Sequence, residues 1–265
     1  PPFSYDEQGT LTRIEKLRGG RIVRFDVRDG GSGLLIASDA DLTKAQQREI
    51  GAVVARCLSF DHDLSTFHEL IRAHPTYLWI ETVGAGRMLV SPTVWEDLAK
   101  TLLTTNTTWA MTKSMVGRLV TLGDASEGGF TFPEPERIAA LDPDVLNQHV
   151  RAGYRGAYLH QLATDIASGA LDVEAWRDPA LPSVEIYKAL KRIRGFGDYA
   201  AGAMMRLLGR FDQLGLDSVC RTMYAGRYNR GLPASDREIA AYYEPFGAWR
   251  GLVVWLDVMR EDILG

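Results

Sequence analysis

The sequence predicts an α+β fold: a small N-terminal domain built on an antiparallel sheet, followed by a mostly helical body. Apolar and charged residues alternate over residues 23–27, as expected for a half-buried strand. A glycine-rich turn at residues 29–33 leads to a second apolar stretch at residues 34–36, which we expect to pair with the first. Beyond residue 90 the apolar residues recur at helical spacing. We therefore expect a sheet domain at residues 1–90 and a helical body at residues 91–265.

The rest of the N-terminal domain is expected to contain one helix and a short buried segment. The helix is indicated by apolar residues that fall on one face, namely Ile50, Val53, Val54, Cys57 and Leu58. Residues 77–80 form an apolar run that predicts a short strand or a buried segment. Loops are expected at residues 123–135 and 178–182.

The composition is that of an ordinary globular protein. Of the 265 residues 46% are hydrophobic and 24% are charged, and no apolar run approaches the length of a membrane span. No signal peptide is visible, and we expect a cytoplasmic location. We also expect the protein to be bacterial, nucleoid-associated and monomeric. The chain begins with Pro1 rather than Met, which indicates a trimmed start.

Neither the cysteines nor the histidines have the spacing of a metal site. Cys57 and Cys220 are the only two cysteines, which excludes a four-cysteine iron–sulfur or zinc site. His62, His68 and His74 are spaced by six, which fits neither helical nor strand geometry, and we expect them at the surface or partly buried.

Charge is distributed unevenly along the chain. The net charge is −4, yet the stretch from Lys188 to Arg230 holds nine basic and three acidic residues, a local balance of +6. Because charges are screened within about 10 Å, a local basic patch can attract phosphates even on an acidic protein. The alternative is a solvated helical face.

Residues 183–208 have the pattern of two helices joined by a tight turn. The apolar faces of the two helices consist of Ile186, Leu190 and Ile193, and of Ala200, Ala203, Met204, Leu207 and Leu208. Gly195 and Gly197 lie in the turn, where glycine opens backbone conformations closed to other residues. The unpaired amides of the second helix can bind an anion such as a DNA phosphate, and Arg194 is expected to contact the same DNA. The alternative is an ordinary helical hairpin.

A carboxylate follows the second helix at Asp217. A carboxylate at such a position can act as a general acid or base, or it can stabilise a developing positive charge. Asp217 can also cap the helix that runs through Val219 and Met223, and the two roles are compatible.

Several segments resemble one family in the same order. The segment from Ile193 to Ala201, followed twenty residues after Gly197 by Asp217, resembles the helix-hairpin-helix DNA glycosylase superfamily, in its alkyladenine and oxoguanine branch. The other segments similar to the family are residues 102–110, 153–158 and 243–250. The match covers essentially the whole chain and is strongest over residues 91–265.

The resemblance implies roles for residues near the reacting bond. Asp217 matches the catalytic aspartate of the family. Tyr199 stands where bifunctional members have a lysine, and a phenol cannot form a Schiff base, so release of the base without strand cleavage is expected. Tyr199 and Trp255 are expected to stack on the extruded base; ordinary packing is the alternative for each.

The resemblance also implies contacts to the duplex. Asn106, Tyr154 and Arg155 match the wedge residues of the oxoguanine branch. Gly251 replaces the glutamine that reads the oxidised base in that branch, and Met111 replaces its arginine for the orphaned base. The substrate evidence is therefore split between the two branches.

The family uses no cofactor for catalysis. Its hairpin holds a monovalent cation through backbone carbonyls, which correspond here to those of Lys191, Ile193 and Phe196, and the cation bridges to a phosphate. No iron–sulfur motif is present.

The function expected from the resemblance is that of a monofunctional DNA glycosylase of base excision repair. Such an enzyme flips a damaged purine out of double-stranded DNA and hydrolyses its N-glycosidic bond. An alkylated purine such as 3-methyladenine is favoured, because aromatic faces attract a cationic base. The alternatives are an 8-oxoguanine-type DNA glycosylase, a non-catalytic helix-hairpin-helix DNA-binding protein, and a glycosylase-lyase that uses Lys113 or Lys191.

Overall fold

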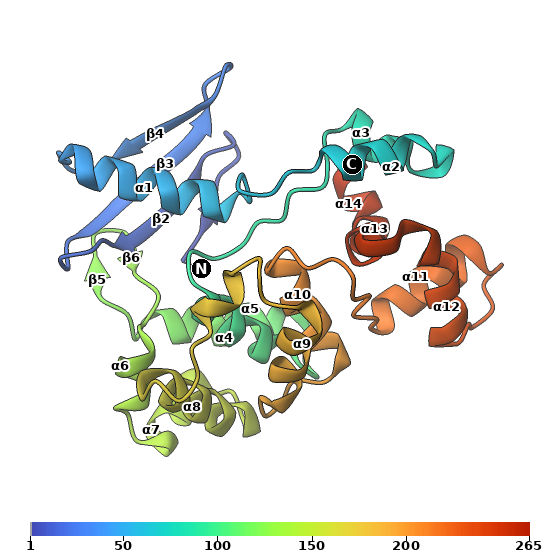
Figure 1. The fold of residues 1–265 in the computed structure, drawn as a ribbon. Coiled ribbons are helices and arrows are strands. Elements are labelled where there is room, and N and C mark those ends of the chain that lie inside the picture. The colour runs from blue at the N-terminus through green and yellow to red at the C-terminus, as the bar shows by residue number, and fades with distance from the viewer. Residues whose placement is uncertain (1) are drawn as a thin grey trace. The chain divides into compact units, whose positions relative to one another are not determined.

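The computed structural model describes residues 2–265, and most of its helices and strands are labelled in Figure 1. The chain folds into two compact units, each made from two stretches of sequence. Unit 1 consists of Pro1–Cys57 and Ser91–Glu174, and unit 2 consists of Leu58–Val90 and Ala175–Gly265. An antiparallel sheet lies at the N-terminus and most of the remaining chain is helical, which confirms the predicted α+β class.

Unit 1 begins with a four-stranded antiparallel sheet in sequence order. Its strands are β1 (Ser4–Tyr5), β2 (Leu11–Lys16), β3 (Ile22–Asp29) and β4 (Leu34–Ser38). Val23, Phe25 and Val27 of β3 are buried, as the alternating pattern predicts, and Val27 pairs with Ile36 across the turn. The helix α1 (Lys44–Cys57) follows the sheet.

The helical part of unit 1 consists of α4 (Val94–Thr104), α5 (Trp109–Val120), α6 (Pro135–Ala139), α7 (Pro143–Val150) and α8 (Tyr154–Ala167), followed by a 3-10 turn, η2 (Glu174–Arg177), at the boundary with unit 2. The expected loop at residues 123–135 instead contains a short hairpin, β5 (Ala125–Ser126) and β6 (Gly129–Phe130). Such two-residue strands are too short to give a periodic signal.

A buried ion pair joins the sheet of unit 1 to α4. The Arg13 guanidinium donates to both carboxylate oxygens of Glu96, at 3.0 and 2.8 Å, and Lys100 donates to the same carboxylate at 2.5 Å. Burial alone would raise the pKa of Glu96, but the two cations hold it down to about 2.

Unit 2 is helical throughout. Its first stretch holds α2 (Ser65–Arg72), η1 (Pro75–Tyr77) and α3 (Leu78–Thr82). Its second stretch holds α9 (Ser183–Arg192), α10 (Asp198–Leu207), α11 (Ser218–Tyr228), α12 (Asp236–Tyr243), η3 (Glu244–Trp249), α13 (Arg250–Val258) and α14 (Arg260–Leu264).

The strand expected as one possibility at residues 77–80 is wrong, because this run is helical. Pro75 occupies the first position of η1, where its fixed φ favours helical geometry. Tyr77 and Ile80 are both buried, so the run is apolar because it enters the core of unit 2. Four apolar residues alone cannot distinguish a buried strand from a buried helical turn.

A buried carboxylate, that of Asp257 on α13, lies within the core of unit 2. The hydroxyls of Tyr77, Tyr228 and Tyr243 donate to it at 2.7–2.9 Å, and Arg227 donates at 2.6 Å. These groups come from η1, α11, α12 and α13, so one carboxylate joins four elements.

The structure bears out the expectation for the histidines, since His62, His68 and His74 are each partly buried. Among the described residues, no group of three or more metal-binding side chains forms. No helix within residues 2–265 is both long and apolar enough to traverse a bilayer.

Candidate functional site

The turn between α9 and α10 is tight and depends on one glycine. Gly195 has φ +91°, in the left-handed region that favours glycine, and the amide of Phe196 donates to the Ile193 carbonyl at 3.1 Å. Phe196 is buried and anchors the turn from inside. Gly197 has an ordinary φ of −82°, and a Cβ added there would meet no atom within 4 Å. A larger side chain at Gly197 can therefore be accommodated without changing the turn.

The side chain of Asp198, in the first turn of α10, is hydrogen-bonded to two residues of α9. Its Oδ1 atom accepts hydrogen bonds from the Tyr187 hydroxyl at 2.8 Å and from Lys191 Nζ at 2.7 Å. Hydrogen bonds from these two groups lower the pKa of the Asp198 carboxyl, which lies in the first turn of α10. The negative carboxylate interacts favourably with the positive end of the α10 dipole. Its hydrogen bonds to Tyr187 and Lys191 also link α10 to α9.

The basic run contributes less free charge than the sequence implies. Lys188 pairs with Glu185, Arg221 with Asp236, and Arg227 with Asp257 and Glu261. All four of these carboxylates lie outside the stretch from Lys188 to Arg230, so the local balance of +6 does not include them.

Next to the turn, Lys191, Arg192 and Arg194 are exposed, and Lys191 pairs with Asp198. The hairpin therefore presents positive charge at the surface, as do the exposed Arg221 and Arg230 later in the run.

Three backbone carbonyls at the hairpin are compatible with a cation. The carbonyls of Lys191 and Phe196 accept no hydrogen bond from any described residue, and the Ile193 carbonyl accepts one, from Phe196. A carbonyl oxygen has two lone pairs, so Ile193 can also ligate.

Asp217 caps α11 and keeps one oxygen available. Its Oδ1 atom accepts the Cys220 amide at 2.7 Å, which confirms the predicted N-cap. The other oxygen, Oδ2, takes no part in this cap, and the residue is only partly buried. Burial raises the pKa of the neighbouring Cys220 thiol to about 11, so this cysteine is not a nucleophile at neutral pH.

Two of the predicted pocket residues lie on helices that pack together. Tyr199 is in the first turn of α10 and Trp255 is on α13, and both are partly buried. The two helices are in contact, and α13 also contacts α11, which Asp217 caps. Unit 2 thus carries the aromatic residues and the carboxylate on three neighbouring helices.

Arg206 was missed as a site residue by reasoning from sequence. It lies on α10, seven residues after Tyr199 and hence on the same side of the helix, and its Cζ atom is 5.4 Å from the centroid of the Trp255 ring. In the sequence, Arg206 stands out only as one of the nine basic residues between Lys188 and Arg230. The sequence did contain a sign that Arg206 is buried, because the residues on both sides of it are apolar: Met204, Met205, Leu207 and Leu208.

Gly251 is required by packing. A Cβ at this position would lie 2.1 Å from the Gln213 carbonyl oxygen, and the Gly251 amide donates to the Phe211 carbonyl at 2.7 Å. The chain therefore has no room for the glutamine that the oxoguanine branch carries there.

The predicted wedge residues come together in unit 1, on the turn after α4 and the start of α8. Asn106 has φ +47° and donates through Nδ2 to the Tyr154 hydroxyl at 3.3 Å. Arg155 is buried and donates to the carbonyls of Thr105, Asn106 and Ala152. The guanidinium also lies 4.6 Å from the centroid of the Tyr154 ring. Arg155 thus orders the turn that presents Asn106.

Asn106 lies on an exposed surface. Tyr154 is 49% exposed, and Trp109 and Met111, at the start of α5, are 69% and 55% exposed. Large apolar side chains at the surface are typical of a binding site.

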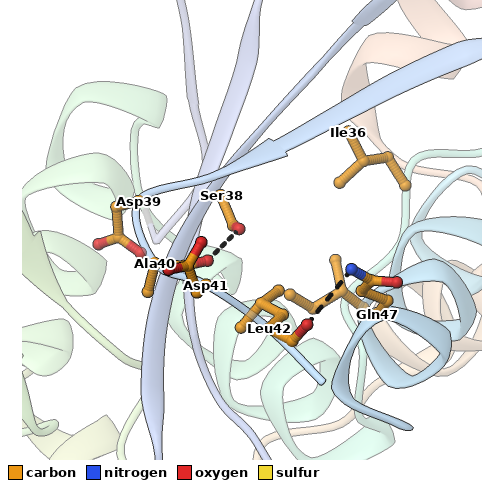
Figure 2. A pocket seen from close by; sticks show the side chains of 8 residues that line it. Ile36, Ser38, Asp39, Ala40, Asp41, Leu42 and Gln47 are labelled. Carbon is orange, nitrogen blue, oxygen red and sulfur yellow. Dashed lines mark hydrogen bonds between the residues drawn. The ribbon is translucent and has the colours of Figure 1, made fainter. Parts of the chain in front are cut away.

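The open hollow shown in Figure 2 lies elsewhere in unit 1, between β4 and α1. The carboxylates of Asp39 and Asp41 line it, and Gln47 donates to the Leu42 carbonyl at 3.3 Å. It contains none of the predicted site residues, and its acidic lining is unfavourable for a phosphate.

Comparison with solved structures identifies the fold. A structure of MBOgg1 in complex with a low-affinity DNA ligand has a TM-score of 0.78 and 20% sequence identity, covering 100% of this chain and 89% of that one. The 3-methyladenine DNA glycosylase of Archaeoglobus fulgidus gives 0.77 and 17%, covering 98% and 90%. The Clostridium acetobutylicum 8-oxoguanine glycosylase/lyase, bound to DNA with cytosine opposite the lesion, gives 0.76 and 19%, covering 98% and 88%.

The fold is shared with both alkyladenine and oxoguanine types. The sequence itself matches no family model and no curated protein. The predicted resemblance to the helix-hairpin-helix DNA glycosylases is therefore confirmed at the level of the fold.

Proposed function

We propose that this protein is a DNA N-glycosylase of base excision repair that hydrolyses the bond between a damaged purine and its deoxyribose. The observation that carries the proposal is the carboxylate of Asp217, which is fixed at the N-terminus of α11 by one oxygen and keeps the other outside the helix cap. It lies on a helix beside the α9–α10 hairpin motif, in a fold shared with DNA glycosylases.

Hydrolysis of the N-glycosidic bond requires a group that stabilises positive charge on the sugar or activates water, and Asp217 can provide it. The bond between C1′ and the base nitrogen breaks, its electron pair leaves with the base, and positive charge develops on the sugar. The free oxygen of the carboxylate stabilises that charge or accepts a proton from the attacking water. Water supplies the hydroxyl to C1′. The remaining proton goes to the departing base if that base was neutral, and through the carboxylate to solvent if it was a cationic alkylpurine.

We further propose that the strand is left intact. Cleavage by a glycosylase-lyase needs an amine that attacks C1′, and Tyr199 provides a phenol instead. Lys188 and Lys191 are the only lysines in the sequence of unit 2. Their amines pair with Glu185 and Asp198, respectively, which argues against either as the nucleophile.

In this proposal the hairpin binds the phosphate backbone of duplex DNA. The amides at the start of α10 and the exposed Arg194 provide donors, and Gly195 and Gly197 allow close approach. A monovalent cation on the carbonyls of Lys191, Ile193 and Phe196 would bridge to a phosphate. Its role is to bind DNA, and it takes no part in the chemistry.

The wedge of unit 1 completes the proposed contacts to DNA. Asn106 and Tyr154 fill the gap left by the extruded base, and Arg155 positions their turn through its bonds to Thr105 and Asn106. Extrusion is required because a stacked base hides its glycosidic bond. The protein acts as a monomer.

The preference for an N-alkylpurine such as 3-methyladenine stays a prediction. It depends on the aromatic faces of Tyr199 and Trp255, and it takes no account of the charge on Arg206. An 8-oxoguanine preference is favoured by the wedge residues, and the packing at Gly251 argues against it.

The test is to incubate the protein with duplexes that each hold one defined lesion. Free base and alkali-sensitive abasic sites should form, while strands stay intact before alkali treatment. Borohydride added during the reaction should trap no covalent protein–DNA adduct. Binding to duplex DNA without base release from any lesion would identify a non-catalytic DNA-binding protein, whereas a trapped adduct would identify a lyase.

A further inference from the structure

Arg206 is a buried cation with unused hydrogen-bond donors. Only 4% of its surface is exposed, and its Nη1 atom donates to the Leu214 carbonyl at 2.7 Å. Its Nε and Nη2 atoms donate to no described residue of unit 2. Buried guanidinium groups normally use all five N–H donors, so Nε and Nη2 of Arg206 are available to water or to a group from outside the chain.

The surrounding chain makes room for this guanidinium. Gly215 has φ +60°, and a Cβ there would lie 2.7 Å from Arg206 Nη1 and 3.0 Å from the Gly202 backbone. A Cβ on Gly202 would in turn lie 2.3 Å from the Gly215 Cα. Two glycines thus let the loop before Asp217 pass directly over α10, at the turn that bears Arg206.

One face of Trp255 already interacts with a positive charge. The Arg206 Cζ atom lies 5.4 Å from the centroid of the indole ring, within range of a cation–π interaction. The expectation of a cationic substrate assumed that the aromatic faces have no cation of their own.

The charge of Arg206 also reaches the proposed catalytic group. Burial lowers the pKa of the guanidinium, and Cys220, Tyr199 and Asp217 counter this effect. Arginine nevertheless stays protonated at neutral pH, because its pKa begins above 12. A fixed positive charge therefore lies within electrostatic range of Asp217.

On the basis of the proposed glycosylase function, we propose that Arg206 determines the class of base that is released. The protein takes a neutral damaged base whose edge presents a carbonyl oxygen or a ring nitrogen, and Nε and Nη2 of Arg206 donate to that acceptor. Cationic N-alkylpurines are disfavoured.

The direction of electron flow gives the physical reason. A neutral base leaves with the electron pair of the broken bond and gains negative charge, which the guanidinium stabilises increasingly as the bond stretches. A cationic base becomes neutral as it leaves. It is repelled by Arg206 when it binds and gains no stabilisation in the transition state.

The test compares kcat/KM for duplexes that contain single hypoxanthine or 8-oxoguanine residues with that for a duplex containing 7-methylguanine. The wild-type protein should favour a neutral base. The variant Arg206→Met removes the charge but keeps the length of the side chain, and the neutral-to-cationic ratio should fall on the order of tenfold or more. Arg206→Lys should retain most of the preference because it retains the charge.

Arg210→Met is the matched control, because Arg210 lies four residues further on and donates only to the backbone carbonyls of Asp178 and Pro179. The ratio of kcat/KM for neutral bases to that for 7-methylguanine should be the same in Arg210→Met as in the wild type. Thermal unfolding and binding to an abasic duplex establish that each variant is folded.

Two results would overturn the inference: faster release of 7-methylguanine than of either neutral base by the wild type, or an unchanged ratio in folded Arg206→Met. If Arg206→Met does not fold, the wild-type ratio still decides. A wild-type protein that releases no base from any duplex would refute the proposed glycosylase function itself.

Discussion

Unit 2 places an aspartate at each end of α11, and the two carboxylates differ in how many donors they meet. At the N-terminal end, Asp217 accepts one backbone amide and keeps Oδ2 outside the helix cap. At the C-terminal end, Arg227 and Tyr228 donate hydrogen bonds to Asp257 of α13. Tyr77 and Tyr243 donate to the same carboxylate, which is fully buried. A carboxylate with every lone pair engaged can only join helices, whereas one with a free oxygen can act on another molecule.

Asp257 therefore serves the stability of unit 2, whereas Asp217 is available for chemistry. Burial and the neighbouring acidic charges raise the pKa of Tyr77 and of Tyr243, so both hydroxyls stay protonated and keep donating to Asp257 at any ordinary pH. Asp217 has no comparable set of donors. Substitutions of Asp217 and of Asp257 should therefore have opposite effects on unfolding and on base release.

The largest expected effect is on the stability of Asp257→Ala. This change leaves three tyrosine hydroxyls without their shared acceptor and Arg227 without its buried partner, which should cost about 3–5 kcal/mol of unfolding free energy. Urea denaturation measures the loss. Well below the melting temperature, the folded fraction should still release base at close to the wild-type rate, and a rate defect in fully folded protein would break the comparison.

Asp217→Asn should show the reverse pattern. Base release should fall roughly 100-fold or more, because a positioned acid or base is usually worth that much. Unfolding should hardly change, since asparagine caps a helix about as well as aspartate. Single-turnover assays and denaturation measure the two quantities. Retention of more than about a tenth of the wild-type rate would remove Asp217 from the catalytic role.

A third variant extends the comparison to the hairpin. Gly197→Val should weaken binding to duplex DNA roughly tenfold or more, because each hydrogen bond to a charged phosphate is worth about 1.5–3 kcal/mol. The turn itself has space for the side chain, so the fold should be kept. Gly226→Val on α11 also meets open space and serves as the control. Equal DNA affinity in both variants would exclude the hairpin as the anchor.

The smallest expected effect is that of Tyr228→Phe. It removes a single hydroxyl from the Asp257 cluster and leaves Tyr77, Tyr243 and Arg227 in place, so about 1 kcal/mol of stability should be lost. No change in base release is expected. A loss as large as that of Asp257→Ala would mean that the cluster depends on Tyr228 alone.

Sequence patterns predicted those features of the fold that depend on neighbouring residues. The sheet, the two hairpin helices and the cap at Asp217 follow from alternation, helical spacing and short polar side chains, and all three are present. The run at residues 77–80 was ambiguous because its burial is set by distant helices of unit 2.

The residues that the sequence did not reveal act across long separations. Asp257 interacts with Tyr77, 180 residues away. Arg206 meets Trp255 only because two helices pack together, and its charge looked like part of a surface patch. A pattern within one segment does not show which distant segment a buried charge will meet.

The close packing at Gly251 bears on how this protein could change its substrate. Any side chain there would collide with the Gln213 carbonyl, only 2.1 Å from the Cβ position. No single codon change at this site can install a base-reading glutamine without first moving the backbone of the loop before Asp217. Directed evolution toward such a reader would have to begin in that loop, and random mutagenesis confined to α13 should return no Gly251 variants that fold.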